Sequence, residues 1–340
     1  PENGKCYLKL IYHLKKELPL LDEDHILGFD EIEVSKDNAK CKLAEKWMQK
    51  AAVDSELQVN ENDTQIHIKG REFAYTIDRR TALFTEMKFA GREYLNHPME
   101  LNIWRAPTDN DMYIKAEWKK AHYDKAYTRA YTTEVVQGKH GVKIVSHASV
   151  VAETVQKILD VKITWTIDAS GKIDADIEAT KDGEFPDLPR FGVRMFLDKK
   201  LSDARYFGMG PQESYRDKHQ AASHGLYRAN VRDLHEDYIR PQENGSHYDC
   251  GYVELNNSRY GMAAFSESTF SFNASYYTQE ELEKKTHNYE LAESDSVVLC
   301  VDYALNGIGS NSCGPVVLEQ YRFNDVLFRF QFTLVPYVKG

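Results

Sequence analysis

Acidic, amide and hydroxyl side chains gather at the end of the segment of residues 104–111, whose sequence is WRAPTDND. Grouped oxygen ligands of this kind can bind Ca²⁺, but the segment lacks the regularly spaced acids, the glycine and the distant glutamate of a calcium loop. The alternative is a turn, because Pro107 fixes one backbone torsion and the side chains of residues 108–111 can cap backbone N–H groups. Arg105 can hold a carboxylate through two parallel hydrogen bonds. We therefore expect a structural turn and no metal here.

Two later segments combine glycine, proline and charged residues in a similar way. Residues 206–217 have the sequence YFGMGPQESYRD, and residues 238–245 have the sequence YIRPQENG. A glycine pair such as Gly208 and Gly210 can let backbone N–H groups surround a phosphate, but Pro211 follows at once and has no N–H. We expect a tight bend between strands in the first segment and a rigid turn in the second.

Taken together and in this order, the three segments resemble the C-terminal domain of the family 2 β-galactosidases. That domain carries the motifs WRAPTDND, YxGxGPxExYxD and YxxPxExG. A fourth segment, GIGSNSCGP at residues 307–315, is similar to the late glycine-rich loop of the family. The resemblance covers residues 55–340, and residues 1–34 resemble the closing strands of the immunoglobulin-like domain that precedes this region in the family.

The resemblance implies an activity for a longer protein. In this family, two glutamates of an upstream eight-stranded barrel carry out the retaining hydrolysis of terminal β-D-galactosides. No segment of this sequence predicts such a barrel, so we expect no catalytic residue here and no hydrolysis by this chain alone. The implied partners are the rest of the β-galactosidase chain or a large subunit, the β-galactoside substrate, and further copies in a homo-oligomer. We expect no cofactor in this chain, because any Mg or Na would belong to the barrel of the parent enzyme.

The resemblance also assigns roles to single residues. We expect the motif residues to hold turns and not to act chemically; they are Trp104, Arg105, Asp109, Asn110, Asp111, Gly208, Gly210, Glu213, Tyr215, Asp217, Pro241 and Glu243. The late loop is the candidate for lining the entrance of the substrate site, through Gly309, Ser310, Asn311 and Cys313. In the family, a tryptophan of this loop stacks on a sugar, and the matching position here is Cys313, whose thiol cannot stack. We expect Cys313 to be a small packed side chain, and the N–H groups of residues 309–311 can face the pocket.

Two other functions stay open. An aldose-epimerase-like sugar enzyme would use His and Glu as acid and base, and residues 219–247 contain His219, His224, His235 and His247. Their spacing does not place them on one face of a strand, which favours separate, hydrogen-bonded histidines. A free-standing carbohydrate-binding module would instead present an exposed aromatic platform, for which residues 275–277 are the candidates.

The composition argues against several classes of protein. The net charge is −10, and the basic residues form no uninterrupted cluster of the kind that binds nucleic acid. No apolar stretch approaches the roughly 20 residues that span a membrane. The five cysteines show no CxxC spacing, which disfavours a disulfide framework or a zinc site. A reducing, cytoplasmic location is the expectation that follows.

Strands must position most of these residues. Apolar and polar residues alternate over residues 159–167, 173–177 and 326–334, and residues 66–68 can pair with residues 73–77. Such alternation is typical of half-buried strands in antiparallel sheets.

Only two segments, residues 113–123 and 280–285, favour short helices. We predict an all-β fold, a large antiparallel supersandwich of the galactose-mutarotase type over residues 55–340. A linker at residues 35–54 would precede it. Residues 1–34 would contribute two strands, at 7–14 and 30–34, to a partial immunoglobulin-like domain.

Overall fold

The computed structural model describes residues 6–34, 57–138 and 141–339, and the chain divides into two compact units after residue 49. In the first unit, β1 (Tyr7–His13) and β2 (Ile26–Glu33) form an antiparallel hairpin in which Tyr7 lies opposite Glu33. Most side chains of both strands are exposed. The second strand begins earlier than residue 30, where the sequence placed it. The linker predicted at residues 35–54 lies outside the described residues, and the immunoglobulin-like assignment stays a prediction.

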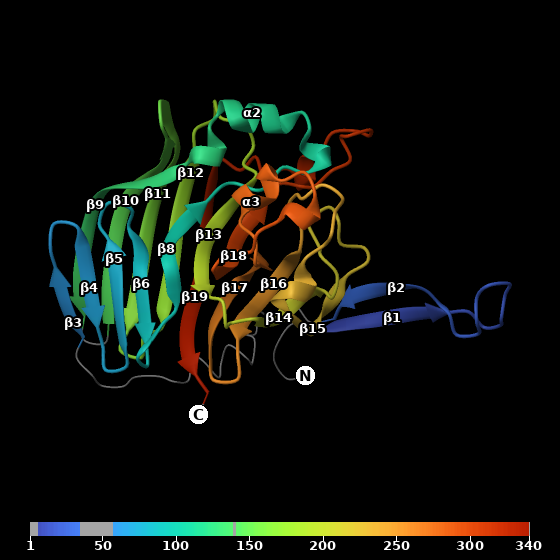
Figure 1. Ribbon diagram of the computed structural model, residues 1–340, viewed down its shortest axis with the longest axis horizontal. Helices are drawn as coiled ribbons and strands as arrows, with labels where there is room; N and C mark the ends of the chain where they lie inside the picture. Colours follow the sequence, from blue (N-terminus) through green and yellow to red (C-terminus); the bar gives the residue numbers. More distant parts are fainter. Residues whose placement is uncertain (1–5, 35–56, 139–140, 340) are drawn as a thin grey trace. The chain divides into compact units, whose positions relative to one another are not determined.

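The second unit is built almost wholly from antiparallel strands, as the sequence predicted (Figure 1). Its strands are β3 (Gln58–Glu61), β4 (Gln65–Lys69), β5 (Phe73–Asp78), β6 (Leu83–Phe89), β7 (Arg92–Glu93), β8 (Leu95–Asn102), β9 (Tyr127–Gly138), β10 (Gly141–Ala152), β11 (Val155–Asp168), β12 (Ile173–Lys181), β13 (Arg190–Asp198), β14 (Asp203–Gly210), β15 (Ser223–Asn230), β16 (Ser246–Asn256), β17 (Tyr260–Ser275), β18 (Ser296–Leu305) and β19 (Leu327–Val338).

The strand registers follow the alternation of apolar residues. Ile163 of β11 lies opposite Ile177 of β12, and Ile177 in turn lies opposite Phe330 of β19. All three side chains are buried. The predicted pairing of β4 with β5 is also present, with Ile68 opposite Tyr75. A shift of one residue would turn each of these apolar sets toward water, so burial specifies the register.

The strands form two sheets that share one core. One has five strands in the order β3-β4-β5-β6-β7, and the other has twelve and contains the path β15-β14-β16-β17-β19-β12-β11-β10-β9. Strand β17 pairs with β19 through its first half and with β18 through its second half, and β18 leads on to β13 and β8. Between the sheets, the ring of Trp165 packs against that of Phe84 at 5.0 Å, and its indole N–H donates to the carbonyl oxygen of Ala82.

Short helices fill the connections. Those in the described part of the chain are α2 (Ile114–Lys120), α3 (Gln279–Lys284), and the 3₁₀ turns η1 (Asp109–Asp111), η2 (Tyr123–Lys125), η3 (Val231–Leu234), η4 (Asn288–Glu290) and η5 (Glu319–Tyr321). Both predicted helices are present: Trp118 is the buried residue of α2, and the Thr278 hydroxyl caps α3 by accepting from the Glu281 N–H. Within the described residues, no helix has the length and apolar character needed to cross a bilayer.

Candidate functional site

The late loop of residues 307–315 follows β18, and the motif of residues 104–111 holds its base. The guanidinium of Arg105 donates to the carbonyl oxygens of Asn306 at 2.5 Å and Gly307 at 3.1 Å. It also makes two parallel hydrogen bonds to the Asp111 carboxylate, at 2.7 and 3.2 Å. This ion pair is buried, and Asp111 in addition accepts from the Thr108 N–H. The two parallel bonds expected of Arg105 are therefore made, and they tie the η1 turn to the loop.

Two further motif side chains hold the backbone of the loop itself. The carboxylate of Asp217 accepts hydrogen bonds from the N–H groups of Ile308 at 2.9 Å and Gly309 at 2.7 Å. The amide of Asn110 donates to the carbonyl oxygen of Gly309 at 2.7 Å and accepts from the Ser312 hydroxyl at 2.8 Å. Segments that are about two hundred residues apart in the sequence thus meet at one loop.

The third motif, at residues 238–245, makes hydrogen bonds to the motifs at residues 104–111 and 206–217. The Gln242 side chain accepts from the N–H of Asp109, and the N–H of Glu243 donates to the carbonyl oxygen of Ala106. The carboxylate of Glu213 accepts from the N–H of Gly245 at 2.8 Å. Glu213 also accepts from the ammonium of Lys218 and the hydroxyl of Tyr238. The second and third segments are therefore joined through one carboxylate.

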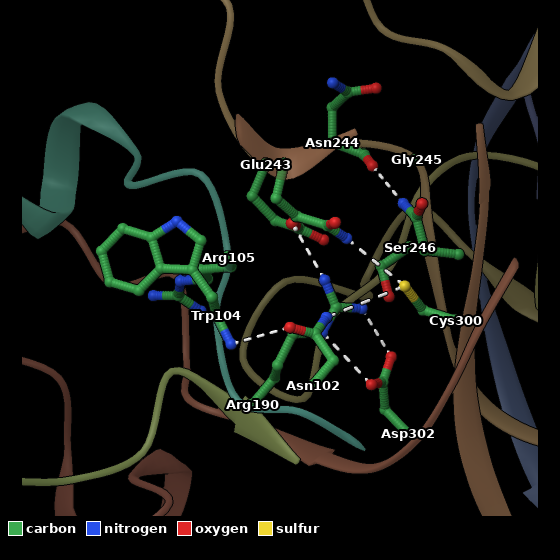
Figure 2. Close-up of polar contacts among 12 residues, drawn as sticks. Asn102, Trp104, Arg105, Arg190, Glu243, Asn244, Gly245, Ser246, Cys300 and Asp302 are labelled. Atoms are coloured by element: carbon green, nitrogen blue, oxygen red, sulfur yellow. Dashed lines mark hydrogen bonds and ion pairs between the residues drawn. The ribbon is translucent and has the colours of Figure 1, made fainter. Parts of the chain in front are cut away.

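A buried cluster of charges lies beneath these turns (Figure 2). Arg190, at the start of β13, makes two hydrogen bonds to Asp302 of β18, at 2.5 and 3.2 Å. Its remaining nitrogen, Nη1, lies 3.2 Å from Glu243 Oε2. All three side chains are at most 2% exposed. The other oxygen of Glu243, Oε1, has no hydrogen-bond partner among the described residues.

Two carboxylates share one guanidinium in this cluster, and burial dominates their titration. Burial raises the pKa of the Glu243 and Asp302 carboxyls, and the positive charge of Arg190 offsets this only in part. Burial also disfavours the charged guanidinium, but Asp302 and Glu243 outweigh it and raise the pKa of Arg190. These groups are closed to solvent in this arrangement, and they join the start of β13 to β18 and to the third motif.

Arg190 and Asp302 were not among the residues that the sequence singled out. Asp302 interrupts the apolar run of β18, and Arg190 precedes the apolar run of β13. A charge within a continuous apolar strand was the available signal, since such a charge has to find a partner when it is buried.

The loop tip is open to solvent, and here one expectation is wrong. Cys313 is exposed, although the sequence led us to expect a packed side chain. Residues 311–313 form a turn whose neighbours Ser312 and Gly314 are exposed as well, so the thiol finds no core to enter. The N–H of Gly309 also differs from expectation, because it donates to Asp217 and does not face a pocket.

The local structure explains why two motif positions are occupied by glycine. A Cβ at Gly208 would lie 2.2 Å from Cys250 Sγ on the neighbouring β16, so only glycine allows these strands to approach. Gly309 has φ +67°, the left-handed region, which lets the loop turn back toward Asn110.

The features expected of the two alternative functions do not come together. Among the four histidines, His224 pairs with Asp249, His219 stacks on Tyr248, and His247 is buried beside Phe272. Residues 275–277 were the candidates for an aromatic platform: Tyr276 is buried, with the cations of Lys199 and Arg232 facing its ring, and Tyr277 is half-buried beside the ring of His235.

The acidic, histidine and cysteine side chains of the described residues are dispersed or engaged by other protein groups. Within residues 6–34, 57–138 and 141–339, His, Cys, Asp and Glu form no group of three or more that could hold a metal ion. The acidic side chains of residues 109–111 bind protein groups instead: Asp109 accepts from Gln242, and Asp111 pairs with Arg105.

Comparisons with known proteins agree with the motifs. A family model described as "Beta galactosidase small chain" matches residues 69–334. A β-galactosidase of Actinobacillus pleuropneumoniae is 41% identical over 334 residues, which are 98% of this chain and 32% of that protein. A β-galactosidase of Staphylococcus xylosus is 32% identical over 326 residues, which are 96% of this chain and 32% of that protein. Among solved structures, the galactose 1-epimerase of Lactobacillus acidophilus NCFM matches with a TM-score of 0.42 and 8% identity, over 85% of this chain and all of that one.

The chain spans about a third of the length of these two curated relatives, 32% in each case.

Proposed function

Because the chain belongs to the β-galactosidase small-chain family, we propose that it is the non-catalytic C-terminal part of a longer β-galactosidase and that its late loop lines the entrance to the substrate site. The observation that carries the proposal is that hydrogen bonds hold the base of the loop of residues 307–315 in place. Side chains from two motifs fix its base, while the tip at Ser312 and Cys313 is exposed. A loop that is rigid at its base and free at its tip is suited to forming one wall of a binding site.

The state of the motif glutamates supports a role without bond breaking. Retaining glycosidases need two carboxyl groups about 5 Å apart on either side of the substrate. Glu213 is engaged by Lys218, Tyr238 and Gly245, and Glu243 is closed to solvent beside Arg190. The hydrolysis of terminal β-D-galactosides would then depend on glutamates elsewhere in the longer chain, as would any bound Mg or Na. The hairpin of β1 and β2 would complete a neighbouring domain of that chain, whose assembly into homo-oligomers is part of the same proposal.

Substitution of Cys313 in the full-length enzyme tests the entrance role. The variant Cys313→Trp places an aromatic plane at the exposed tip, and we expect KM for lactose to change at least twofold while the fold is kept. The matched control is Lys200→Trp. Lys200 is exposed and lies in the turn that follows β13, at the opposite end of that strand from Arg190. An unchanged KM in Cys313→Trp, or an equal change in both variants, would count against the loop as a wall of the site.

The non-catalytic role has a separate test. Purified chain of residues 1–340 is assayed for hydrolysis of a nitrophenyl galactoside, with and without the remaining part of the enzyme. We expect activity only when the remaining part is present. Hydrolysis by this chain alone would overturn the proposal.

A further inference from the structure

The chain that follows the tip of the late loop carries an exposed apolar strip. No residue from 307 to 318 is charged, although charged residues make up 28% of the protein. Val316 is 69% exposed and Leu318 is 61% exposed, and Pro315 beside them is exposed as well. We call Pro315, Val316 and Leu318 the loop strip. Its side chains present apolar surface directly to solvent.

The residue between the two large side chains of the strip is packed differently. Val317 is half-buried against the two glycines at the base of the loop. A Cβ at Gly309 would lie 2.6 Å from Val317 Cγ2, and a Cβ at Gly307 would lie 2.8 Å from Val317 Cγ1. Val317 thus occupies the contact with the base of the loop, and Val316 and Leu318 are left on the side of the solvent.

Hydrogen bonds fix the chain on both sides of the strip. After it, the N–H of Tyr321 donates to the carbonyl oxygen of Leu318 at 2.9 Å, and the N–H of Gly307 donates to the carbonyl oxygen of Tyr321 at 2.8 Å. Before it, the hydroxyl of Ser312 donates to the Asn110 side chain at 2.8 Å. A segment held at both ends in this way is preformed as a surface.

Such a strip differs from an ordinary exposed apolar residue. Single apolar side chains are common on protein surfaces, whereas a continuous apolar segment without charges is typical of the central part of a contact surface. An unpaired charge opposite such a segment is costly to bury. The partner surface that matches Val316 and Leu318 is therefore apolar and uncharged.

The position of the strip identifies the partner. It follows closely on Cys313, at the tip that is proposed to form a wall of the substrate entrance. A loop can line a site on another part of a protein only if it reaches that part. This chain covers 32% of the length of each of two curated relatives, so the greater part of such a protein lies outside it. The proposed function places the substrate site in that other part.

We propose that the loop strip docks onto the part of the longer protein that carries the substrate site, and that this contact holds the tip of the loop at the entrance. The inference rests on the proposed function, because it takes this chain to be one part of a longer β-galactosidase.

The first test compares amide hydrogen exchange of residues 315–318 in the full-length enzyme and in the separate chain of residues 1–340. The N–H groups of residues 316–318 have no hydrogen-bond partner in the described part of the chain, so they should exchange fast when the chain is alone. In the full-length enzyme we expect exchange to be at least tenfold slower, because the strip is covered. Equal exchange in the two proteins would overturn the proposal.

The second test places a charge in the contact of the full-length enzyme. Leu318→Asp should bring the exchange of residues 315–318 to within about threefold of the rate in the separate chain. The matched control is Leu226→Asp, at an exposed position of β15, which should leave this exchange unchanged. If the separate chain is not recovered, these two variants decide by themselves. Equal exchange in both variants would contradict the docking.

Two further outcomes separate the partner and the proposed function from the docking. Protection of the strip that is lost when an oligomer is dissociated by dilution would mean that a second copy covers it, which overturns the proposed partner. A protected strip together with an unchanged KM in Cys313→Trp would support the docking and count against the entrance role alone. An open strip together with a changed KM in that variant would overturn the docking alone.

Discussion

At the scale of single residues, the turns of this protein depend on charges that are withdrawn from water. Arg190 holds two carboxylates, from Asp302 and Glu243, and the whole cluster is closed to solvent. Removing one partner of a buried ion pair leaves an uncompensated charge, which is far more costly than losing a pair at the surface. The cluster should therefore behave quite differently from the exposed ion pairs of the same protein.

Substitution of Arg190 by Met tests this difference. We expect the free energy of unfolding to fall by about 3–5 kcal/mol, because Asp302 and Glu243 lose their cation. The control Arg329→Met, whose guanidinium pairs with Asp176 at a largely exposed position, should cost less than about 1 kcal/mol. Urea denaturation at pH 7 measures both. Equal losses would contradict the role of the buried cluster, and the loss in Arg190→Met should shrink at acidic pH, where the carboxyls become protonated.

His247 gives the stability a pH dependence. Burial lowers its pKa from the ordinary 6.5 to about 4, so the imidazole stays neutral in the folded protein while the unfolded chain takes up a proton between these values. The free energy of unfolding should therefore fall, by roughly 3 kcal/mol, as the pH is lowered from 6.5 to 4. The variant His247→Phe, which can stack between Tyr206 and Phe272 in its place, should lack this contribution.

The measurement is the difference between the two proteins in urea denaturation at several pH values. His287→Phe, at an exposed position, is the control and should follow the unaltered protein. A constant difference between His247→Phe and the unaltered protein over this pH range would show that His247 does not titrate as described.

The sequence indicated some of these contacts and not others. Contacts between residues close together in the sequence could be predicted, whereas contacts between distant residues could not. Arg105 and Asp111 are six residues apart within one turn, so the residue types were enough to suggest their hydrogen bonds. Arg190 and Asp302 are 112 residues apart, and only the pairing of β13 with β18 brings them together. The exposure of Cys313 was missed because small, apolar character does not tell whether a loop has a core beneath it.

At the scale of elements, the late loop depends on carboxylate and amide side chains from distant segments. Asp217 is the clearest case, because each of its oxygens accepts from one backbone N–H of the loop, those of Ile308 and Gly309. The loop has few side chains of its own that could fix its path, so its order should depend on these acceptors.

The variant Asp217→Asn replaces a charged acceptor by a neutral one that can satisfy only one of the two N–H groups. We expect amide hydrogen exchange of the peptide covering residues 308–314 to become about tenfold faster, because opening of the loop costs less free energy. Asp237→Asn, at an exposed position, is the control and should leave exchange unchanged. The test is exchange followed by mass spectrometry, and unchanged protection in Asp217→Asn would mean that other contacts order the loop.

The elements themselves were the most predictable part of the molecule. The hairpin of β11 and β12, the pairing of β4 with β5, and the helices α2 and α3 all lie where the sequence placed them. Alternation of apolar residues is a local signal, and antiparallel hairpins use local contacts. The order of strands in the large sheet is not local, and no pattern in β17 indicated that its two halves pair with different strands.

At the scale of the whole molecule, residues 50–340 form one compact unit with a core that extends through both sheets. Trp165 joins them: its ring meets Phe84 of the five-stranded sheet on one side and Phe332 of its own sheet on the other. Its N–H donates to the Ala82 carbonyl oxygen at 2.8 Å. Because the two sheets bury their apolar faces against each other, neither can lose its partner without exposing the core.

Substitution of Trp165 should therefore weaken both sheets together. Trp165→Ala leaves a cavity and an unpaired carbonyl, and we expect a loss of about 3–5 kcal/mol and a melting temperature about 10 °C lower. Trp165→Phe keeps much of the packing, so its loss should be smaller, about 1–3 kcal/mol. Tyr131→Ala, at an exposed position, serves as the control. Calorimetry of residues 50–340 should show one transition in every variant, since a shared core makes unfolding cooperative. Two separate transitions in Trp165→Ala would mean that the sheets are stable independently of each other.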